Sequence, residues 1–427
     1  MTDATLAVLG GPPVRTTPLP SVADASGRTF GDEELALLTR VIRSGRLNRN
    51  GGTLVRQLET DFAAWVGAAD CVASTSGTAA LHLAVGALDL DPGDEVITTP
   101  ITDFGTIIPI LMQNGVPVFA DVDPDSWCLD PADVARKITP RTRAIIPVHL
   151  FGQPADLDPL LALAREHDLV LIEDCSQAYG TRYRGRPTGV QGHIGCYSLQ
   201  QSKHLSAGDG GLTVTNDPAL ARRMRLFSDK GWPRDGDQRT HLFLAPNYRM
   251  TELQGAVALA QLGKVDGVIE RRRAVAARLD ACVSDLPGLH PPRPRAGDRT
   301  TYWLYPLHYD ADALGVPLRD VCTALTAEGI PAAAGYVPPV YHAPVLRELR
   351  TYGTSGFPFG SPYTSRSGAE YRDALCPIAE AMSDRMLHLA VNERFTDADV
   401  DDIDRALTKV VTHYARARAG RGAGVGG

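Results

Sequence analysis

Residues 169–178 read Leu-Val-Leu-Ile-Glu-Asp-Cys-Ser-Gln-Ala, and this stretch decides how the rest of the chain is interpreted. The continuous apolar run Leu169–Ile172 predicts a strand that is buried on both faces. The run ends in two carboxylates, Glu173 and Asp174. Because doubly wound α/β sheets bind ligands at the carboxyl ends of their strands, a functional carboxylate is expected here. Taken alone, Asp174 also fits a capping or solvated side chain.

Similar apolar runs lie on both sides of this stretch. The strand-like runs are Cys71–Ser74, Glu95–Thr99, Val116–Ala120, Ala144–Leu150, Leu169–Glu173, Gly195–Leu199 and Gly211–Thr215. Amphipathic stretches such as Ala79–Leu88 and Leu157–His167 separate several of them. Strands that alternate with helices predict an α/β fold with a mostly parallel seven-stranded sheet between helices.

Composition and pattern divide the chain into four segments. Residues 1–30 are rich in Pro, Gly and Thr and predict an extended N-terminal arm, and residues 31–265 carry the strand–helix alternation of a large domain. A smaller C-terminal α+β domain is expected over residues 266–415, beyond the long helical block and across the Pro-rich segment Leu286–Gly297. Residues 416–427 are mostly Gly, Ala and Arg, and we expect them to be disordered.

Composition also excludes several classes of protein. The 427 residues are 44% hydrophobic and 22% charged, as in an ordinary globular chain. The net charge of −7 makes a nucleic-acid partner unexpected. No apolar run is as long as the ~18 residues of a membrane span, and no signal peptide is recognisable, so we expect a cytoplasmic protein without a membrane partner. The seven Cys lack Cys-x-x-Cys spacing, so they are interpreted as small apolar residues, and no metal site is expected.

Two further segments carry chemistry. Lys203 lies between the run that contains Ser198 and the Gly-rich segment Gly208–Gly211, which leads into the next strand. This context favours a lysine inside the domain over an ordinary surface lysine. Ser76-Gly77-Thr78 lies between a strand and a helix, where backbone N–H groups form an anion site, although plain helix capping gives the same pattern.

Together the carboxylate, the lysine and the anion site suit one ligand, pyridoxal 5′-phosphate (PLP). The PLP aldehyde bonds to a lysine, and a carboxylate holds the pyridine nitrogen protonated. A helix N-terminus with hydroxyl groups suits the phosphate. The sequence therefore predicts PLP as the cofactor.

At this point the sequence closely resembles the DegT/DnrJ/EryC1/StrS family of sugar aminotransferases. The resemblance covers about residues 48–411 and is carried by several motifs in order. They include Ser76–Leu81, Phe119–Pro124, Pro147–Pro154, Glu173–Ala178, Gly208–Gly211 and Asn247–Gln254. The resemblance implies the fold of PLP-dependent transferases of type I.

The resemblance also implies roles for individual residues. Lys203 matches the lysine that bonds to PLP, Asp174 the partner of the pyridine nitrogen, and Gln177 a residue near the ring hydroxyl. The matches to the phosphate site are Gly77, Thr78, Ser198 and Asn247. In the family the Asn comes from a neighbouring subunit, which implies a homodimer with shared active sites.

Two positions depart from the family pattern. One is Asp209, where Glu is common, and this change is conservative. The other concerns an aromatic residue. Family members usually place an aromatic residue directly after a Thr, and its ring stacks on PLP. Here the run is Thr102-Asp103-Phe104, so an ungapped alignment places Asp103 at that position. Phe104 is the nearest ring and is the predicted stacking residue, with Asp103 as the alternative.

The resemblance implies an aminotransferase that moves an amino group from L-glutamine or L-glutamate to a keto-sugar or a scyllo-inosose-like keto-cyclitol, in amino-sugar or aminocyclitol antibiotic biosynthesis. One alternative is a PLP-dependent sugar dehydratase of the same fold, whose relatives carry His at the lysine position. Another is a regulator that binds PLP without catalysis. Candidate segments for substrate recognition are 230–241, 336–342 and 392–393.

Overall fold

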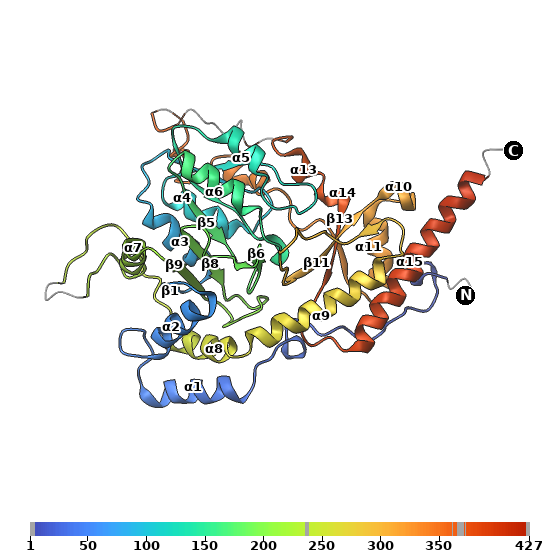
Figure 1. The fold of residues 1–427 in the computed structure, drawn as a ribbon, viewed down its shortest axis with the longest axis horizontal. Coiled ribbons are helices and arrows are strands. Elements are labelled where there is room, and N and C mark those ends of the chain that lie inside the picture. The colour runs from blue at the N-terminus through green and yellow to red at the C-terminus, as the bar shows by residue number, and fades with distance from the viewer. Residues whose placement is uncertain (1–4, 235–238, 361, 365–370, 372, 424–427) are drawn as a thin grey trace.

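The computed structural model describes residues 5–234, 239–360, 362–364, 371 and 373–423. Its largest element is a seven-stranded sheet (Figure 1). In spatial order the strands are β1 (Asp70–Ser74), β9 (Gly211–Thr215), β8 (Ile194–Ser198), β5 (Val170–Asp174), β4 (Thr142–Ile146), β2 (Glu95–Thr98) and β3 (Val116–Phe119). The pairs from β8 to β3 are parallel, and β9 is antiparallel to both of its neighbours. The prediction of a mostly parallel seven-stranded sheet is confirmed.

Alternate residues of the strands pack on opposite faces of the sheet, as the two-residue period of a strand requires. Ile145 and Leu171 contact one set of helices, and Ile146 and Ile172 contact another. The first set holds α5 (Pro131–Lys137) and α6 (Leu157–Glu166), and the second holds α3 (Gly77–Ala87), α4 (Ile108–Met112) and α7 (Pro218–Ser228). Near β1 and β9, the face of the sheet opposite α3 and α7 is covered by α2 (Leu54–Val66) and α8 (Glu252–Leu262).

A second sheet forms the core of a smaller α+β unit. Its antiparallel strands, in spatial order, are β10 (Leu289–His290), β11 (Leu304–Tyr309), β13 (Met386–Ala390) and β12 (Ala332–Ala334). The long helix α9 (Val265–Val283) runs from the large sheet to this unit (Figure 1). There, α9 and α11 (Leu318–Ala327) both pack against α15 (Asp397–Ala423). The shorter elements are α1 (Asp32–Ser44), α10 (Ala311–Leu314), α12 (Pro344–Arg347), α13 (Pro377–Glu380), α14 (Met382–Arg385) and the hairpin β6–β7 (Arg182–Tyr183, Arg186–Pro187).

The two ends of the chain differ from simple extended segments. In the predicted arm, Leu6 is fully buried in the core of the smaller unit, and Arg15 pairs with Asp399 and Asp402 of α15. At the other end, α15 continues to Ala423, past the predicted start of a disordered tail at residue 416. Ala and Arg are strong helix formers, and they outweigh a cost of about 1 kcal/mol for each interior Gly. Residues 424–427 lie outside the described part, and the predicted domain boundaries remain predictions.

Two simpler predictions concern cysteines and hydropathy. Cys71, Cys128, Cys175 and Cys196 are buried with free thiols, as expected for small apolar residues. Within the described residues, no helix combines the length and the apolar character needed to cross a membrane.

Candidate active site

A cavity of about 320 Å³ lies at the carboxyl ends of the parallel strands. It is there because β1, β5 and β8 all end at this edge of the sheet, and the segments that follow them turn over it. Six of the predicted site residues line it: Gly77, Thr78, Asp174, Gln177, Ser198 and Lys203. Three sequence segments that are far apart in the chain therefore meet, as the sequence predicts.

The Lys203 side chain is held deep inside this cavity, with only 9% of the residue exposed. Its Nζ lies 3.9 Å from the centroid of the Trp303 ring, and it forms no ion pair with any residue in the described part of the chain. Burial lowers the pKa of the Lys203 amine to about 8, although the nearby Asp174 carboxylate opposes that shift. A lysine with a lowered pKa has a larger neutral fraction, which is the form that attacks a carbonyl group.

Asp174 is 2% exposed, and two hydrogen bonds fix its carboxylate. Oδ1 accepts the backbone N–H of Ser176 at 3.0 Å, and Oδ2 accepts the Thr106 hydroxyl at 2.9 Å. The single hydrogen of the Thr106 hydroxyl is used for the bond to Asp174. The Thr102 hydroxyl therefore donates to the Thr106 oxygen, at 2.8 Å. The carboxylate thus has a defined orientation at the floor of the cavity.

The start of α3 forms an anion site at one side of the cavity. Ser76 caps this helix by accepting the N–H of Ala79 at 3.0 Å, which leaves the N–H groups of Gly77 and Thr78 for a ligand. A Cβ on Gly77 would lie 2.6 Å from the Cβ of Ser198, so only glycine allows the start of α3 to approach the end of β8 so closely. The Ser198 hydroxyl and two helix N–H groups then surround one space.

Gln177 lines the same cavity and joins the two units of the structure. Its Oε1 accepts the N–H of Phe151 at 2.7 Å, and its Nε2 donates to the Tyr336 hydroxyl at 3.3 Å. Tyr336 comes from the smaller unit and also lines the cavity. The amide therefore holds one wall of the site in place.

Comparison with known proteins agrees with this geometry. The model of the DegT/DnrJ/EryC1/StrS aminotransferase family matches residues 28–408. The chain belongs to this family. It is 36% identical to the L-glutamine:2-deoxy-scyllo-inosose aminotransferase of Streptoalloteichus tenebrarius, covering 97% of this chain and 99% of the relative. It is 37% identical to the enzyme of the same name from Streptomyces kanamyceticus, over 96% of this chain and 97% of the relative.

A solved structure of DesI in the presence of its TDP-sugar product superposes with a TM-score of 0.81. That protein is 30% identical, and the superposition covers 97% of each chain. The predicted fold, that of PLP-dependent transferases of type I, is confirmed, and so is the prediction that the chain is an aminotransferase. The residue roles, in contrast, depend on the geometry of this chain.

One residue predicted from the family pattern does not reach the cavity. Phe104 is partly buried and faces a separate apolar hollow beside Met112 and Tyr352, so it does not line the cavity, and its role as the stacking residue stays a prediction. The reason is local. Asp103 caps the short 3₁₀ helix Phe104–Thr106, accepting the Gly105 N–H at 2.7 Å, and this turn directs Asp103 toward the cavity and Phe104 away from it.

Asn247 also lies away from the cavity of its own chain. It is exposed, forms a β-bridge with Asp229 and accepts the N–H of Arg249 at 3.4 Å. Within one family subunit this is the position expected of a residue that serves a neighbouring subunit. Its assignment to the phosphate site therefore remains a prediction.

The candidate substrate segments separate into two groups. Tyr336 of the segment 336–342 lines the cavity, whereas Trp232 of the segment 230–241 packs against Arg234 and Arg239. Residues 235–238 of that segment lie outside the described part of the chain. The pair at 392–393 is buried elsewhere, where Glu393 accepts the Arg272 Nε–H at 2.8 Å.

The cavity also has lining residues that no sequence motif marks as cofactor residues, namely Trp303, Thr106 and Tyr336. Trp303 lines the cavity beside Lys203, and its Nε1 donates to the carbonyl of Ser202 at 3.0 Å. Thr106 contacts Asp174 directly. For Thr106, the signal in the sequence was the run 102–106 after a strand end. No comparable signal marks Trp303 and Tyr336 as cofactor residues, because they come from the smaller unit.

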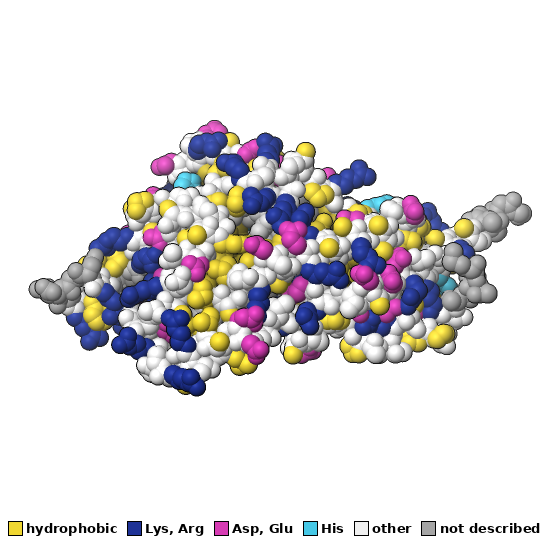
Figure 2. Space-filling model, turned by 60° about the horizontal axis from the view of Figure 1, so that its bottom comes forward, with side chains coloured by type: hydrophobic (Ala, Val, Ile, Leu, Met, Phe, Trp, Pro, Cys, Tyr) yellow, Lys and Arg dark blue, Asp and Glu magenta, His cyan; other side chains and the backbone are white. Residues whose placement is uncertain are grey.

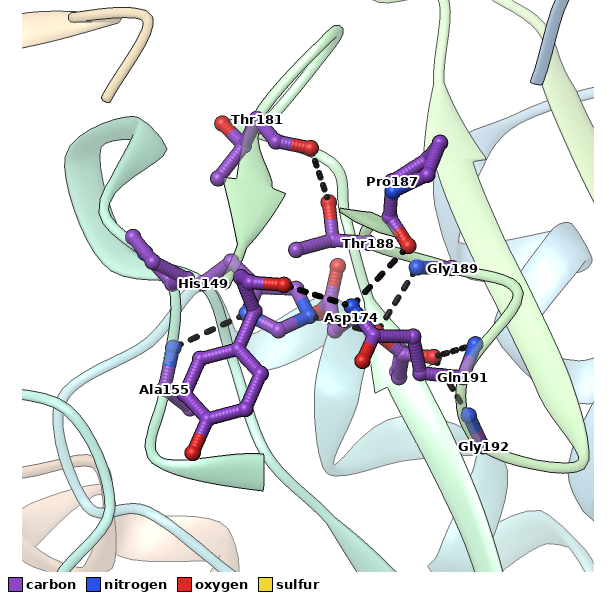
Figure 3. Close-up of polar contacts among 12 residues, drawn as sticks. His149, Ala155, Asp174, Thr181, Pro187, Thr188, Gly189, Gln191 and Gly192 are labelled. Atoms are coloured by element: carbon purple, nitrogen blue, oxygen red, sulfur yellow. Dashed lines mark hydrogen bonds and ion pairs between the residues drawn. The ribbon is translucent and has the colours of Figure 1, made fainter. Parts of the chain in front are cut away.

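Glu173, the second carboxylate of the opening stretch, belongs to the interior and not to the cavity. It is fully buried, and His149 donates to it from Nε2 at 3.0 Å because Nδ1 of that ring accepts the N–H of Ala155. Burial alone would raise the pKa of Glu173, but these hydrogen bonds hold it below its usual range. Its other donors are the backbone N–H groups of Gly189, Gln191 and Gly192 (Figure 3).

The same cluster could be mistaken for a metal centre. Ligand atoms of His149, Glu173 and Cys175 lie within 4.8 Å of one another. However, both ring nitrogens of His149 and both oxygens of Glu173 are already engaged in hydrogen bonds. Burial also raises the pKa of the Cys175 thiol, which disfavours the thiolate that a metal requires. The cluster is explained by its hydrogen bonds.

Proposed function

We propose that this chain is a PLP-dependent aminotransferase that moves the amino group of L-glutamine onto a keto-cyclitol. The observation that carries the proposal is the placement of Lys203 in one cavity with Asp174 and the helix start at Gly77. The relatives named above act, by their names, on 2-deoxy-scyllo-inosose with L-glutamine.

The residues present fit PLP. The amine of Lys203 is buried without an ion-pair partner among the described residues, as suits a group that bonds to an aldehyde. The space beside Gly77 would be filled by any Cβ, which fits a phosphate held by the N–H groups of Gly77 and Thr78 and by the Ser198 hydroxyl. Asp174 would face the pyridine nitrogen. When bound, PLP withdraws electrons from the bonds at the attached amino group.

Each residue then has a defined task. Asp174, oriented by Thr106, keeps the ring nitrogen protonated. Lys203 would hold the cofactor aldehyde, and as a free amine it would move the proton of the donor's α-carbon. Gln177 and Tyr336 hold the wall beside the ring.

The position of His204 favours an aminotransferase over a sugar dehydratase. Dehydratases of this fold carry His where Lys203 stands. His204 is buried, and its Nε2 donates to the Thr301 carbonyl at 3.0 Å, away from the cavity lining. Burial also lowers the pKa of this imidazole far below its usual range, so it stays neutral.

The function is tested by incubating the purified protein and PLP with each pairing of two donors and two acceptors. The donors are L-glutamine and L-glutamate, and the acceptors are 2-deoxy-scyllo-inosose and a nucleotide-linked keto-sugar. We expect the amine of the cyclitol to form most rapidly with L-glutamine. Formation of a deoxy-sugar without nitrogen would favour the dehydratase, and PLP binding without any product would favour the regulator. A cytoplasmic location, in which such metabolites are available, remains a prediction.

The pKa of Lys203 predicts how the apo protein takes up its cofactor. Because the neutral amine is the reactive form and its pKa is about 8, covalent attachment of PLP should accelerate as pH rises toward and through 8. The measurement is the rate at which the absorbance of lysine-bound PLP appears, followed from pH 6 to pH 10. A rate that keeps rising in proportion to hydroxide up to pH 10, as for an ordinary surface lysine, would contradict this environment.

The proposal includes a homodimer in which each site uses both chains. Large apolar side chains are exposed on and beside α1, at Phe30, Leu35, Ile42 and Leu47. Hydrophobic side chains also gather in the middle of the face shown in Figure 2. Exposed apolar groups of this kind are typical of an interface. Leu244, three residues before Asn247, is 98% exposed, as expected of a segment that contacts a neighbour.

Complementation tests the shared site. A Lys203→Ala chain and an Asn247→Asp chain are each expected to be inactive, the second because its carboxylate would repel the phosphate. After mixing, dissociation and reassociation, hybrid dimers would hold one site with both defects and one intact site. Random pairing should restore up to about a quarter of wild-type activity. No recovery in verified hybrid dimers, or a monomer by sedimentation, would reject the shared site.

A further inference from the structure

The charges on the cavity wall are unbalanced once the proposed cofactor is in place. The described lining holds three carboxylates, Asp103, Asp174 and Asp209, and one cationic side chain, Lys203. Asp174 is engaged by the ring nitrogen, and Lys203 by the aldehyde or, when the acceptor binds, by the proton that it moves. Two carboxylates, Asp103 and Asp209, are then left facing the space for the acceptor.

Asp103 is held in place at one oxygen and available at the other. Its Oδ1 accepts the N–H of Gly105 at 2.7 Å, which fixes the side chain as the cap of the 3₁₀ helix. No residue in the described part of the chain pairs with its Oδ2, and the residue is exposed toward the cavity. The same helix carries Thr106, which contacts Asp174, so Asp103 has a fixed position relative to the cofactor site.

Lys203 lies close enough to interact with this carboxylate, but no cation among the described residues forms an ion pair with it. Arg234 and Arg249, from the segment that the proposed dimer would bring toward a neighbouring site, both pair with Asp229. Arg272, which lies behind Lys203, pairs with Glu393 at 2.8 Å. Among the described residues the Oδ2 of Asp103 therefore has no ion-pair partner, and it is open to an ammonium or hydroxyl group of a ligand.

We infer that Asp103 selects the acceptor: it binds a ring ketone that carries no phosphate, and it binds most tightly when that ring bears a positively charged amino group. The inference rests on the proposed function and specifies the substrate class of the same site. A carboxylate accepts stronger hydrogen bonds from an ammonium group than from a neutral hydroxyl. It repels a phosphate or a nucleotide at the same distance.

Asp103 stands where the family resemblance leads us to expect an aromatic ring. The face of a neutral ring attracts a cation, but a ring has no formal charge that would repel a phosphate. The carboxylate therefore adds a charge selection that the usual residue does not supply. Asp209, at the other carboxylate position, replaces a Glu that is common in the family, so it adds no new charge.

The test compares Asp103→Asn with the wild type. The amide keeps an oxygen for the Gly105 N–H but removes the charge. The matched control is Asp24→Asn, because Asp24 caps another three-residue 3₁₀ helix by accepting the Ser26 N–H at 2.8 Å, in a segment that does not line the cavity. Each protein is assayed with L-glutamine and three acceptors: a neutral keto-cyclitol, its amino-bearing analogue and a phosphorylated analogue.

We expect the wild type to use the amino-bearing ketone best and the phosphorylated ketone least. Asp103→Asn should lower kcat/KM for the amino-bearing ketone by about 10-fold, mainly through KM, as loss of one charge-assisted hydrogen bond predicts. It should change the neutral ketone by less than about 3-fold and improve the phosphorylated one. An equal change for all three acceptors, or no change, would overturn the inference.

A binding measurement separates this inference from the proposed function. Isothermal titration of an aminocyclitol and of a cyclitol phosphate into the protein loaded with the amine form of the cofactor, which cannot bond to a second amine, needs no turnover. Tighter binding of the aminocyclitol that weakens with salt and is lost in Asp103→Asn supports the role of Asp103. If the wild type aminates none of the ketones, the proposed function fails, and this titration still decides the charge selection. Equal affinities in both proteins would overturn it.

Discussion

Replacing Lys203 by alanine is expected to abolish transamination and the covalent attachment of PLP while the fold survives. The amine is the nucleophile that holds the cofactor and the base that moves the donor's proton, so activity should fall by at least about 10⁴-fold. The fold should survive because Nζ contacts the face of Trp303 and, among the described residues, forms no ion pair with a carboxylate. Turnover with the neutral keto-cyclitol and the absorbance of lysine-bound PLP are the two measurements.

A chemical-rescue experiment provides the control for this variant. Added small amines, which can fill the space left by the side chain, should restore part of the proton transfer in Lys203→Ala. Far-ultraviolet circular dichroism and the melting temperature should match the wild type. Turnover near the wild-type rate without added amine would remove Lys203 from the mechanism.

The Asp174→Asn variant is expected to retain PLP and to slow proton abstraction by about 10²–10⁴-fold. An amide in this position keeps the hydrogen bond from Thr106 to its oxygen but cannot hold the ring nitrogen protonated, so the electron-withdrawing power of the bound cofactor falls. The measurement is a single-turnover reaction with L-glutamine. PLP retention is checked separately by absorbance.

Thr106→Val is the matched control for Asp174. It removes the hydroxyl that orients the carboxylate at Oδ2 but keeps the charge, so the rate should fall far less than in Asp174→Asn. An unchanged single-turnover rate in Asp174→Asn would show that another group serves the ring nitrogen. Glu173 is not available for that task, because hydrogen bonds from His149 and Gly189 occupy its carboxylate.

The sequence predicts well those features that depend on one strand and the turn that follows it. Leu169–Asp174 forms the expected buried strand, and Asp174 reaches the cavity because strand residues alternate in direction, which turns Glu173 into the interior. The Gly77 turn and Lys203 also follow strand ends. Residues of this kind are placed by the sheet itself, so their position could be derived without a structure.

Features that depend on a local turn or on distant packing were not predictable. Asp103 lines the cavity in place of Phe104, because one side-chain cap, to the Gly105 N–H, decides which residue faces it. Trp303 reaches Lys203 only because the smaller unit packs against the large sheet. The continuation of α15 to Ala423 reflects a small balance between helix-forming Ala and Arg and helix-breaking Gly.

The most direct test of the function follows the nitrogen atom. The purified protein with PLP is given a keto-cyclitol and L-glutamine whose α-amino nitrogen carries a heavy isotope, and the cyclitol product is analysed by mass spectrometry. We predict a ring amine that contains the heavy nitrogen, and none in the Lys203→Ala variant. A product that has lost oxygen without gaining nitrogen, or an unchanged ketone beside bound PLP, would contradict the assignment of this chain as a keto-cyclitol aminotransferase.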